Sequence, residues 1–179
     1  MNLYFMRHGR TNYNDLAICN DDPSQDAHLT ELGIQQAQAA AEQLRDARLE
    51  RIIVSPLPRT RQTAEYVNRH HQLEIETRPE IRDLRSGFEG LPVADYFAEV
   101  AHDPLHARIN GGESVLDHKQ RIEGFISWLK QQPQDSILVV AHEETLRVFY
   151  AHFEGDISDE QMRDHDFDNC QILSYSITR

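Results

Sequence analysis

Cysteines and long apolar runs are both scarce in this chain of 179 residues. Its two cysteines, Cys19 and Cys170, lie far apart in the sequence and are too few for a disulfide framework or a cysteine-based metal site. No apolar run approaches the length of a membrane span, and the N-terminal run ends at Arg7. We therefore expect a cytoplasmic protein with free thiols, no membrane-spanning segment and no signal peptide.

Positive charge is also in short supply. The chain has 18 Lys and Arg residues against 30 Asp and Glu residues, which gives a formal net charge of -12. The negative overall field does not attract nucleic acid or an anionic membrane surface, so we expect neither as a partner. An acidic protein that binds an anion must gather its few cations in one pocket, which makes the position of each arginine informative.

The sequence motifs of several other enzyme classes are missing. There is no Gly-rich dinucleotide motif after a strand and no Walker motif, so neither dinucleotide nor P-loop chemistry is supported. The segment HEETL (residues 142–146) begins like a zinc-protease motif, but Leu146 stands where the second histidine is required. We expect no bound metal ion and no cofactor.

Apart from these gaps, the composition is that of an ordinary globular domain, with 39% hydrophobic and 27% charged residues. Short apolar segments alternate with amphipathic ones along the chain. We expect strands at residues 3–6, 51–54, 73–78, 136–141 and 172–177. We expect helices at residues 30–47, 58–70, 93–101, 115–131 and 145–153. Ser114 caps the fourth of these, with Asp117 in a variant capping box. This alternation predicts a layered α/β fold with a mostly parallel sheet.

Two segments do not follow this alternation. Residues 15–28 are polar and are interpreted as a surface loop. Residues 80–112 are irregular and rich in glycine and proline around one short helix, which indicates an insertion over the edge of the sheet. Because no linker or repeat is visible, residues 1–179 are expected to form a single domain.

Polar, phosphate-seeking residues follow three of the expected strands. His8 and His142 each end a buried-type strand, and Arg59 lies just after a third. The carboxyl ends of parallel strands meet at one edge of a sheet, so we expect these residues to converge there together with Arg7. Arginine offers a planar fork of donors that suits phosphate oxygens, and helix N-termini add backbone N–H groups. The pattern predicts a phosphate site.

These residues also resemble a known family. The segment RHGRT (residues 7–11) is similar to the RHGxT signature of the histidine phosphatase superfamily, which includes cofactor-dependent phosphoglycerate mutases and small phosphatases. Further matching segments follow in the family's order: LTELG at 29–33, SPLPRTRQTA at 55–64, GGES at 111–114 and VVAH at 139–142. The resemblance implies a three-layer α/β/α sandwich of the phosphoglycerate mutase type, with residues 80–112 as a cap-like insertion.

The resemblance also implies catalytic roles. It identifies His8 as the nucleophile that forms a phosphohistidine, and Arg7, Arg59 and His142 as the groups that bind the phosphoryl oxygens. The physical chemistry agrees, because the imidazole must be neutral to attack phosphorus and the neighbouring cations disfavour its protonation. The same cations would stabilise charge in the transition state without a metal ion.

The proton donor is a point where the chain departs from the family. The family usually has a glutamate in this segment, whereas the chain has Asp83 within IRDLRSGFEG (residues 81–90). We expect Asp83 to be the acid and base, with Glu80 and Glu89 as alternatives. The competing interpretation is that Asp83 is a surface carboxylate paired with an arginine.

A second departure follows His142, where the family often has two glycines and this chain has Glu143 and Glu144. Carboxylates beside an anion site repel the substrate unless they point away. They could contact a cationic or hydroxyl-bearing part of the substrate, and Glu143 is a candidate substrate-binding residue on this interpretation. The favoured interpretation is simply that acids suit the first turn of a helix.

Four other residues are weaker candidates for substrate binding. Thr11 and Asn14 follow the histidine motif and are either secondary phosphate contacts or capping residues. Glu113 and Arg147 are candidates for the pocket wall. The sequence leaves the substrate and the oligomeric state open.

The favoured function is hydrolysis of a small phosphorylated metabolite. The first alternative is mutase-type phosphoryl transfer, which is disfavoured because the mutases that the chain resembles have longer insertions. The second alternative is a phosphate-binding regulatory module with weak turnover.

Overall fold

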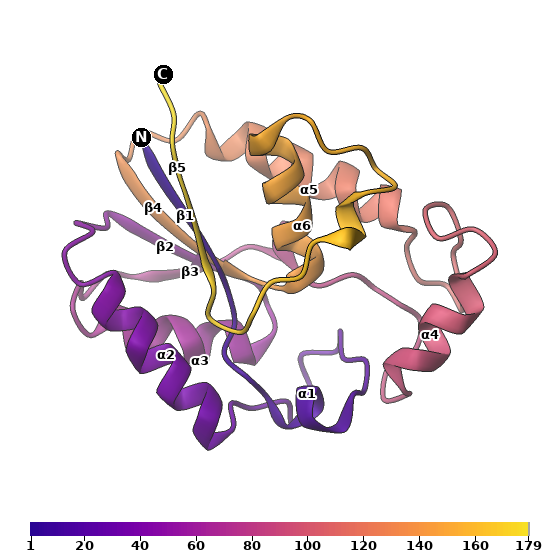
Figure 1. The fold of residues 1–179 in the computed structure, drawn as a ribbon. Coiled ribbons are helices and arrows are strands. Elements are labelled where there is room, and N and C mark those ends of the chain that lie inside the picture. The colour runs from indigo at the N-terminus through magenta and orange to yellow at the C-terminus, as the bar shows by residue number, and fades with distance from the viewer. Residues whose placement is uncertain (179) are drawn as a thin grey trace.

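The computed structural model describes residues 1–178 and is built on a five-stranded sheet with helices on both faces (Figure 1). The strands are β1 (Asn2–Arg7), β2 (Arg51–Val54), β3 (Ile75–Thr77), β4 (Ser136–Ala141) and β5 (Ile172–Ser176). The α-helices are α1 (Asn12–Leu16), α2 (Glu31–Gln43), α3 (Pro58–Asn68), α4 (Val93–Val100), α5 (Val115–Leu129) and α6 (Glu143–Glu154). Two short 3₁₀ helices span Pro79–Ile81 and Met162–Asp164. The predicted α/β fold class is confirmed.

The strand order is β3-β2-β4-β1-β5. Four strands are parallel, and β5 runs antiparallel to β1 at the edge of the sheet. The chain crosses from β1 to β2 and later returns from β3 to β4, so β4, which comes late in the sequence, lies between β1 and β2. As a result, Arg7 at the end of β1 is in register with Ala141 at the end of β4.

The strands are apolar because both faces of the sheet are covered. In β4, Ile137 and Val139 pack with residues of α5 and α6, whereas Leu138 and Val140 pack with residues of α2 and α3. Helices α2 and α3 lie on one side of the sheet in Figure 1, and α5 and α6 lie on the other. This double burial explains why the strands have continuous apolar runs rather than alternating ones.

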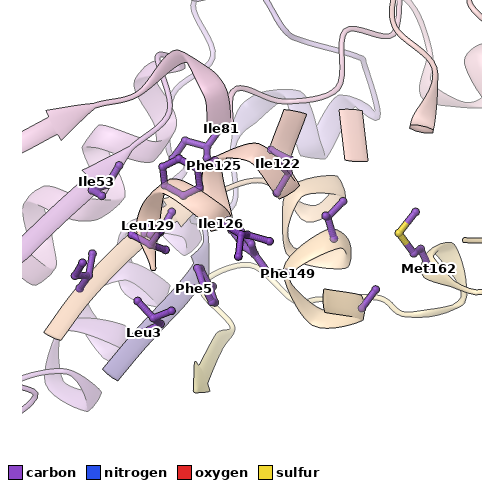
Figure 2. Close-up of a cluster of buried hydrophobic side chains, with 14 of the residues drawn as sticks. Leu3, Phe5, Ile53, Ile81, Ile122, Phe125, Ile126, Leu129, Phe149 and Met162 are labelled. Carbon is purple, nitrogen blue, oxygen red and sulfur yellow. The ribbon is translucent and has the colours of Figure 1, made fainter. Parts of the chain in front are cut away.

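The core between the sheet and α5 and α6 is mainly aliphatic and includes a group of stacked aromatic rings (Figure 2). Phe5 of β1 stacks on Phe149 of α6 with ring centroids 3.9 Å apart, and Phe125 of α5 lies 6.3 Å from Phe149. Full burial of a side chain of this kind stabilises the fold by about 1.5–3 kcal/mol. This packing fixes the position of β1, the strand that leads directly to Arg7 and His8.

Side-chain caps set where several helices begin. The Thr30 hydroxyl accepts a hydrogen bond from the Gly33 amide at the start of α2. At α5, Ser114 and Asp117 form the predicted capping box, in which each side chain accepts a hydrogen bond from the other residue's amide. Helix α2 ends at Gln43, earlier than the predicted residue 47, because the chain goes into turns after Leu44.

Two predictions about local structure need correction. Residues 12–16 form the short helix α1, which the polar sequence did not indicate, and Thr11 caps it. Helix α6 begins at Glu143, two residues before the predicted start, because its first turn follows the end of β4 directly. Helix α4 lies away from the sheet, within the irregular segment 80–112 (Figure 1).

Within residues 1–178, none of the helices is both long enough and apolar enough to cross a bilayer.

Candidate active site

The two histidines lie side by side at the carboxyl edge of the sheet. The His8 backbone N–H donates to the Ala141 carbonyl over 3.0 Å, which continues the β1–β4 ladder beyond the strands. The rings of His8 and His142 have centroids 5.4 Å apart and meet edge to face. The structure therefore brings together the two strand ends that the sequence predicted to converge.

His8 is held in one tautomer. Its Nδ1 lies 2.7 Å from the Gly9 carbonyl oxygen, which can only accept, so Nδ1 carries the hydrogen. Its Nε2 therefore has a lone pair, which accepts a hydrogen bond from Nε of Arg59 over 3.1 Å. Burial lowers the pKa of His8 well below its ordinary value, and the charges of Arg59, His142 and Arg7 lower it further. The imidazole is neutral, as a nucleophile must be.

Arg59 lies in the first turn of α3, where Pro58 provides the first helical residue. The guanidinium is 5% exposed and donates in three directions. Besides Nε to His8, one terminal nitrogen donates to Oδ1 of Asn20 over 2.5 Å. The other donates to the Asn20 carbonyl over 3.0 Å and to Oδ2 of Asp83 over 3.1 Å. Arg59 thereby links His8 to Asp83.

Asn20 was not predicted as a site residue. It lies in the segment 15–28, which was interpreted as a surface loop, yet it is buried against Arg59 and lines the cavity. Glu89 holds this part of the loop, because its carboxylate accepts from the amides of Asp21 and Asp22 and from the Asn20 side chain. The interpretation as a surface loop is wrong at Asn20. A buried asparagine within a polar run carries no signal that separates it from its exposed neighbours.

Asp83 is the only one of the three candidate proton donors that lines the cavity. Its Oδ2 lies 3.1 Å from Arg59 and 3.5 Å from Nδ1 of His142, and its Oδ1 accepts from the Leu84 amide over 2.9 Å. Glu80 instead forms an ion pair with Arg78, and Glu89 orders the loop around Asn20.

His142 is fully buried and reaches the site indirectly. Its Nε2 lies 2.7 Å from the hydroxyl of Ser55, the residue that follows β2, and its Nδ1 faces Asp83. It does not itself line the cavity. Burial lowers its pKa well below the ordinary value, and the nearby Arg59 charge adds to this. Ser55, which fixes the ring, belongs to a recognised motif but was not singled out as a site residue.

Glu113 lies behind the site rather than in its wall. Its carboxylate forms an ion pair with Arg121 and accepts from the Arg85 amide over 3.1 Å. Arg121 also donates to the carbonyls of Glu80 and Arg82, over 2.6 and 3.1 Å. This pair, of which Glu113 is buried and Arg121 partly buried, holds the backbone on both sides of Asp83. A buried carboxylate is stable only beside a cation, and Arg121 of α5 is the cation that pairs with Glu113.

A cavity of about 470 Å³ opens above these groups. Arg7, His8, Arg59 and Asp83 all line it. The remaining lining residues come mainly from the segment around α1, from the irregular segment with α4, and from α6 and the segment after it: Thr11, Tyr13, Asn14, Ile18, Cys19, Asn20, Leu84, Ser86, Val93, Tyr96, Phe97, Glu143, Glu144, Arg147, Arg163 and Asp166. The lining thus combines an apolar, aromatic part with a charged part.

Charged residues of α6 form an ion-pair chain along one side of the cavity. Glu143 lies 3.0 Å from Arg7 and 3.3 Å from Arg147, and Glu144 lies 2.8 Å from Arg147 and 3.2 Å from Arg163. Both glutamates occupy the first turn of the helix, as predicted. They also face the cavity, which the favoured interpretation of a simple helix-turn preference did not include.

Thr11 and Asn14 both line the cavity and form the capping box of α1. Each side chain accepts a hydrogen bond from the other's backbone amide. Their capping role is therefore present. In residues 1–178, no cluster of three or more His, Cys, Asp or Glu side chains is arranged to hold a metal ion.

The sequence comparisons agree with this geometry. The family model of the histidine phosphatase superfamily (branch 1) matches residues 3–179. The probable phosphoglycerate mutase GpmB of Yersinia pestis (strain Pestoides F) is 31% identical over 151 residues, which cover 79% of this chain and 69% of the relative.

Solved structures with the same fold include the α-ribazole phosphatase of Shigella flexneri. It has a TM-score of 0.89 and 28% identity, and the match covers 100% of this chain and 92% of that one. A putative α-ribazole-5'-P phosphatase of Escherichia coli K-12 has a TM-score of 0.87 and 28% identity, over 97% of this chain and 89% of the other. With a family model that spans nearly the whole chain and a sheet edge that gathers the motif residues, the protein belongs to the histidine phosphatase superfamily, branch 1.

Proposed function

We propose that the protein hydrolyses a small phosphorylated metabolite through a phosphohistidine intermediate on His8. One observation carries the proposal: His8, whose Nε2 lone pair accepts a hydrogen bond from Arg59, lines a cavity together with Arg7 and Asp83. Arg7 and Arg59 supply cationic donors where the oxygens of a phosphoryl group would lie.

In the first step, Nε2 of His8 attacks phosphorus as the bond to the ester oxygen breaks. Arg59 transfers its hydrogen bond from Nε2 to a phosphoryl oxygen, which frees the lone pair. Arg7 and Arg59 then stabilise the negative charge on the equatorial oxygens, the contribution that is usually largest in phosphoryl transfer. The Nδ1–H bond to the Gly9 carbonyl disperses the positive charge that develops on the ring.

Asp83 is the proposed proton donor to the leaving oxygen. Its Oδ2 lies beside Arg59 and faces the cavity. In the second step, Asp83 takes a proton from water as the water oxygen attacks phosphorus, and the bond between phosphorus and Nε2 breaks. The products are the free alcohol, inorganic phosphate and unmodified His8, so atoms and charges balance. Proton transfer of this kind typically contributes a factor of roughly 10²–10⁴.

The rest of the cavity suits the alcohol part of a small ester. A volume of about 470 Å³ falls within the range of small-molecule sites, roughly 300–1,000 Å³. The apolar part includes Val93, Tyr96 and Phe97, and we propose that residues 80–112 act as a cap that selects the substrate through them. Phe97 is 44% exposed, so its ring is free to contact a ligand.

We also propose a cytoplasmic location, which the two free cysteines favour.

The test is turnover of an aryl phosphate with the wild-type chain and with His8→Ala, over acidic to neutral pH and with a chelator present. We expect hydrolysis that resists chelation and falls by roughly 10³ or more in the variant. Rapid acid-free quenching should trap a phosphoryl adduct on the peptide that contains His8. An adduct on another peptide, or hydrolysis that does not depend on His8, would refute the proposal.

The names of the relatives suggest the first metabolites to compare. α-Ribazole phosphate and 3-phosphoglycerate belong in a panel of monoesters ranked by kcat/KM. Mutase-type transfer remains the alternative, and the relative named as a probable phosphoglycerate mutase favours testing it. Phosphate appearing on a second position of phosphoglycerate, rather than in solution, would identify a mutase. Oxyanion binding without turnover of any ester would identify a regulatory module.

A further inference from the structure

Glu143 places a carboxylate inside the proposed phosphate pocket. Its Oε2 lies 3.0 Å from a terminal nitrogen of Arg7, and both side chains line the cavity. A carboxylate at this position is unexpected beside a dianionic substrate, because like charges in a partly buried site repel strongly.

The structure also shows that this carboxylate is held in place. Its second oxygen, Oε1, accepts from the Phe167 amide over 3.3 Å and lies 3.3 Å from Arg147. Arg147 is itself buried and is anchored by Glu144 at 2.8 Å and by the His165 carbonyl at 2.9 Å. Glu143 is thus held by contacts on two sides.

Arg7, in turn, is only partly satisfied. One terminal nitrogen donates to the Phe167 carbonyl and pairs with Glu143. Its Nε is buried and has no hydrogen-bond partner within residues 1–178. An oxyanion bound at Arg7 would share the guanidinium with the Glu143 carboxylate.

We propose that Glu143 is a built-in counter-charge that orients Arg7 and lowers the affinity of the pocket for free phosphate. The inference rests on the proposed function, since it assumes that phosphate binds at Arg7. An ester still binds, because its alcohol part contacts the rest of the cavity, whereas released phosphate has only the anion contacts. Glu143 is therefore a specificity-determining residue that favours release of the product and makes inorganic phosphate a weak inhibitor.

The test is direct binding of inorganic phosphate and of tungstate, measured by calorimetry on Glu143→Gln. Glutamine keeps an oxygen that can accept from Arg7 but removes the charge. We expect binding to tighten by about tenfold or more. Glu154→Gln removes the same charge from the far end of α6 and should change binding by less than about threefold, because exposed charges at that distance are screened.

Two further variants sharpen the result. Glu144→Gln removes a cavity carboxylate that pairs with Arg147 and Arg163 but not with Arg7, so its effect should be clearly smaller than that of Glu143→Gln. Glu143→Ala removes both the charge and the hydrogen bond, and should tighten binding less than glutamine does. Thermal unfolding shows whether Glu143→Gln is folded. If it is not, Glu143→Ala serves as the test variant in its place.

Unchanged or weaker binding in Glu143→Gln, or equal tightening in Glu144→Gln, would overturn the inference. The binding measurement needs no turnover, so the two proposals can fail separately. If Glu143→Gln binds phosphate more tightly but no hydrolysis depends on His8, the counter-charge role of Glu143 is supported and the phosphatase proposal is refuted. If hydrolysis depends on His8 but Glu143→Gln does not bind phosphate more tightly, the phosphatase proposal is supported and the counter-charge role is refuted.

Discussion

Arg59 donates its Nε hydrogen to Nε2 of His8 across 3.1 Å. In the proposed mechanism this lone pair attacks phosphorus, so a bound phosphate group must first accept the hydrogen bond from Arg59 in place of His8. The same guanidinium also donates to Asp83, so a single side chain contacts both the proposed nucleophile and the proposed proton donor.

Replacing Arg59 with lysine tests this coupling. Lysine keeps the charge but cannot reach His8, Asn20 and Asp83 from one planar group. We expect kcat/KM for an aryl phosphate to fall by roughly 10² or more, the cost seen when one aligned transition-state donor is removed. Arg61→Lys is the matched control, since Arg61 lies in the same helix and contacts the Ile75 carbonyl and Thr77. Similar losses in both variants would contradict the coupling.

Asp83→Asn tests the proton donor. We expect hydrolysis of an alkyl phosphate to fall by roughly 10²–10⁴, because its alkoxide needs a proton to leave. An activated aryl phosphate leaves without help, so it should lose far less. The measurement is kcat/KM for both esters. Equal losses for the two would assign the proton to another group.

The buried histidines predict how stability depends on pH. The pKa of His8 and that of His142 are both well below the ordinary value of 6.5, through burial and nearby cations. Between the lowered pKa and 6.5 the unfolded chain binds more protons, so stability falls as the pH drops below about 6.5. Denaturant unfolding at pH 7 and pH 5 should show this loss. His8→Asn should reduce it, and an unchanged slope in that variant would contradict the prediction.

Glu113 predicts a second loss of stability at lower pH. Burial raises the pKa of Glu113, but hydrogen bonds from His118 and Arg121 outweigh this and lower it to about 2. The pair with Arg121 is therefore complete above the ordinary value of 4.5 and is lost as the pH falls towards 2. Glu113→Gln should destabilise the fold at pH 7 by about 3 kcal/mol and remove this acid sensitivity. It should also lower kcat, because Arg121 clamps the carbonyls beside Asp83.

Gly33→Ala tests a close approach between backbones. A Cβ at Gly33 would lie 2.0 Å from the Arg10 carbonyl oxygen, in the segment that follows His8. The variant should shift that segment and lower both stability and activity. Gly124→Ala is the control, because nothing lies within 4 Å of its Cβ on the exposed side of α5. That change should stabilise the protein by about 1 kcal/mol. The measurements are the free energy of unfolding and the turnover of an aryl phosphate, each made on both variants.

Local chemistry made much of the fold predictable. The strands at residues 51–54 and 136–141 were predicted with their observed bounds because both are short, continuous apolar runs. The start of α5 followed from the capping pair at Ser114 and Asp117. Helix α1 was missed because its sequence is polar, and it depends on Thr11 and on contacts with distant loops rather than on an apolar face.

The candidate site divides in the same way. Asp83 could be named from its position in a motif, but its distances to Arg59 and His142 depend on a loop that Arg121 holds in place. Asn20 could not be named, because its role comes from a contact with a residue 39 positions away. Glu143 was expected in a helical turn, while its pairing with Arg7 follows from the neighbouring positions of β1 and β4.

By itself, the sequence determined the alternation of strands and helices, the helix cap at Ser114 and the choice of His8 as the candidate nucleophile, because periodicity, capping and motifs act within a few residues. Only the tertiary structure decided the strand order that places β4 beside β1, the burial that keeps His8 neutral, and the ion pair of Glu143 with Arg7. All three features depend on which distant segments pack against one another. The burial of a charged or titratable group is a property of the packed chain rather than of any local sequence pattern.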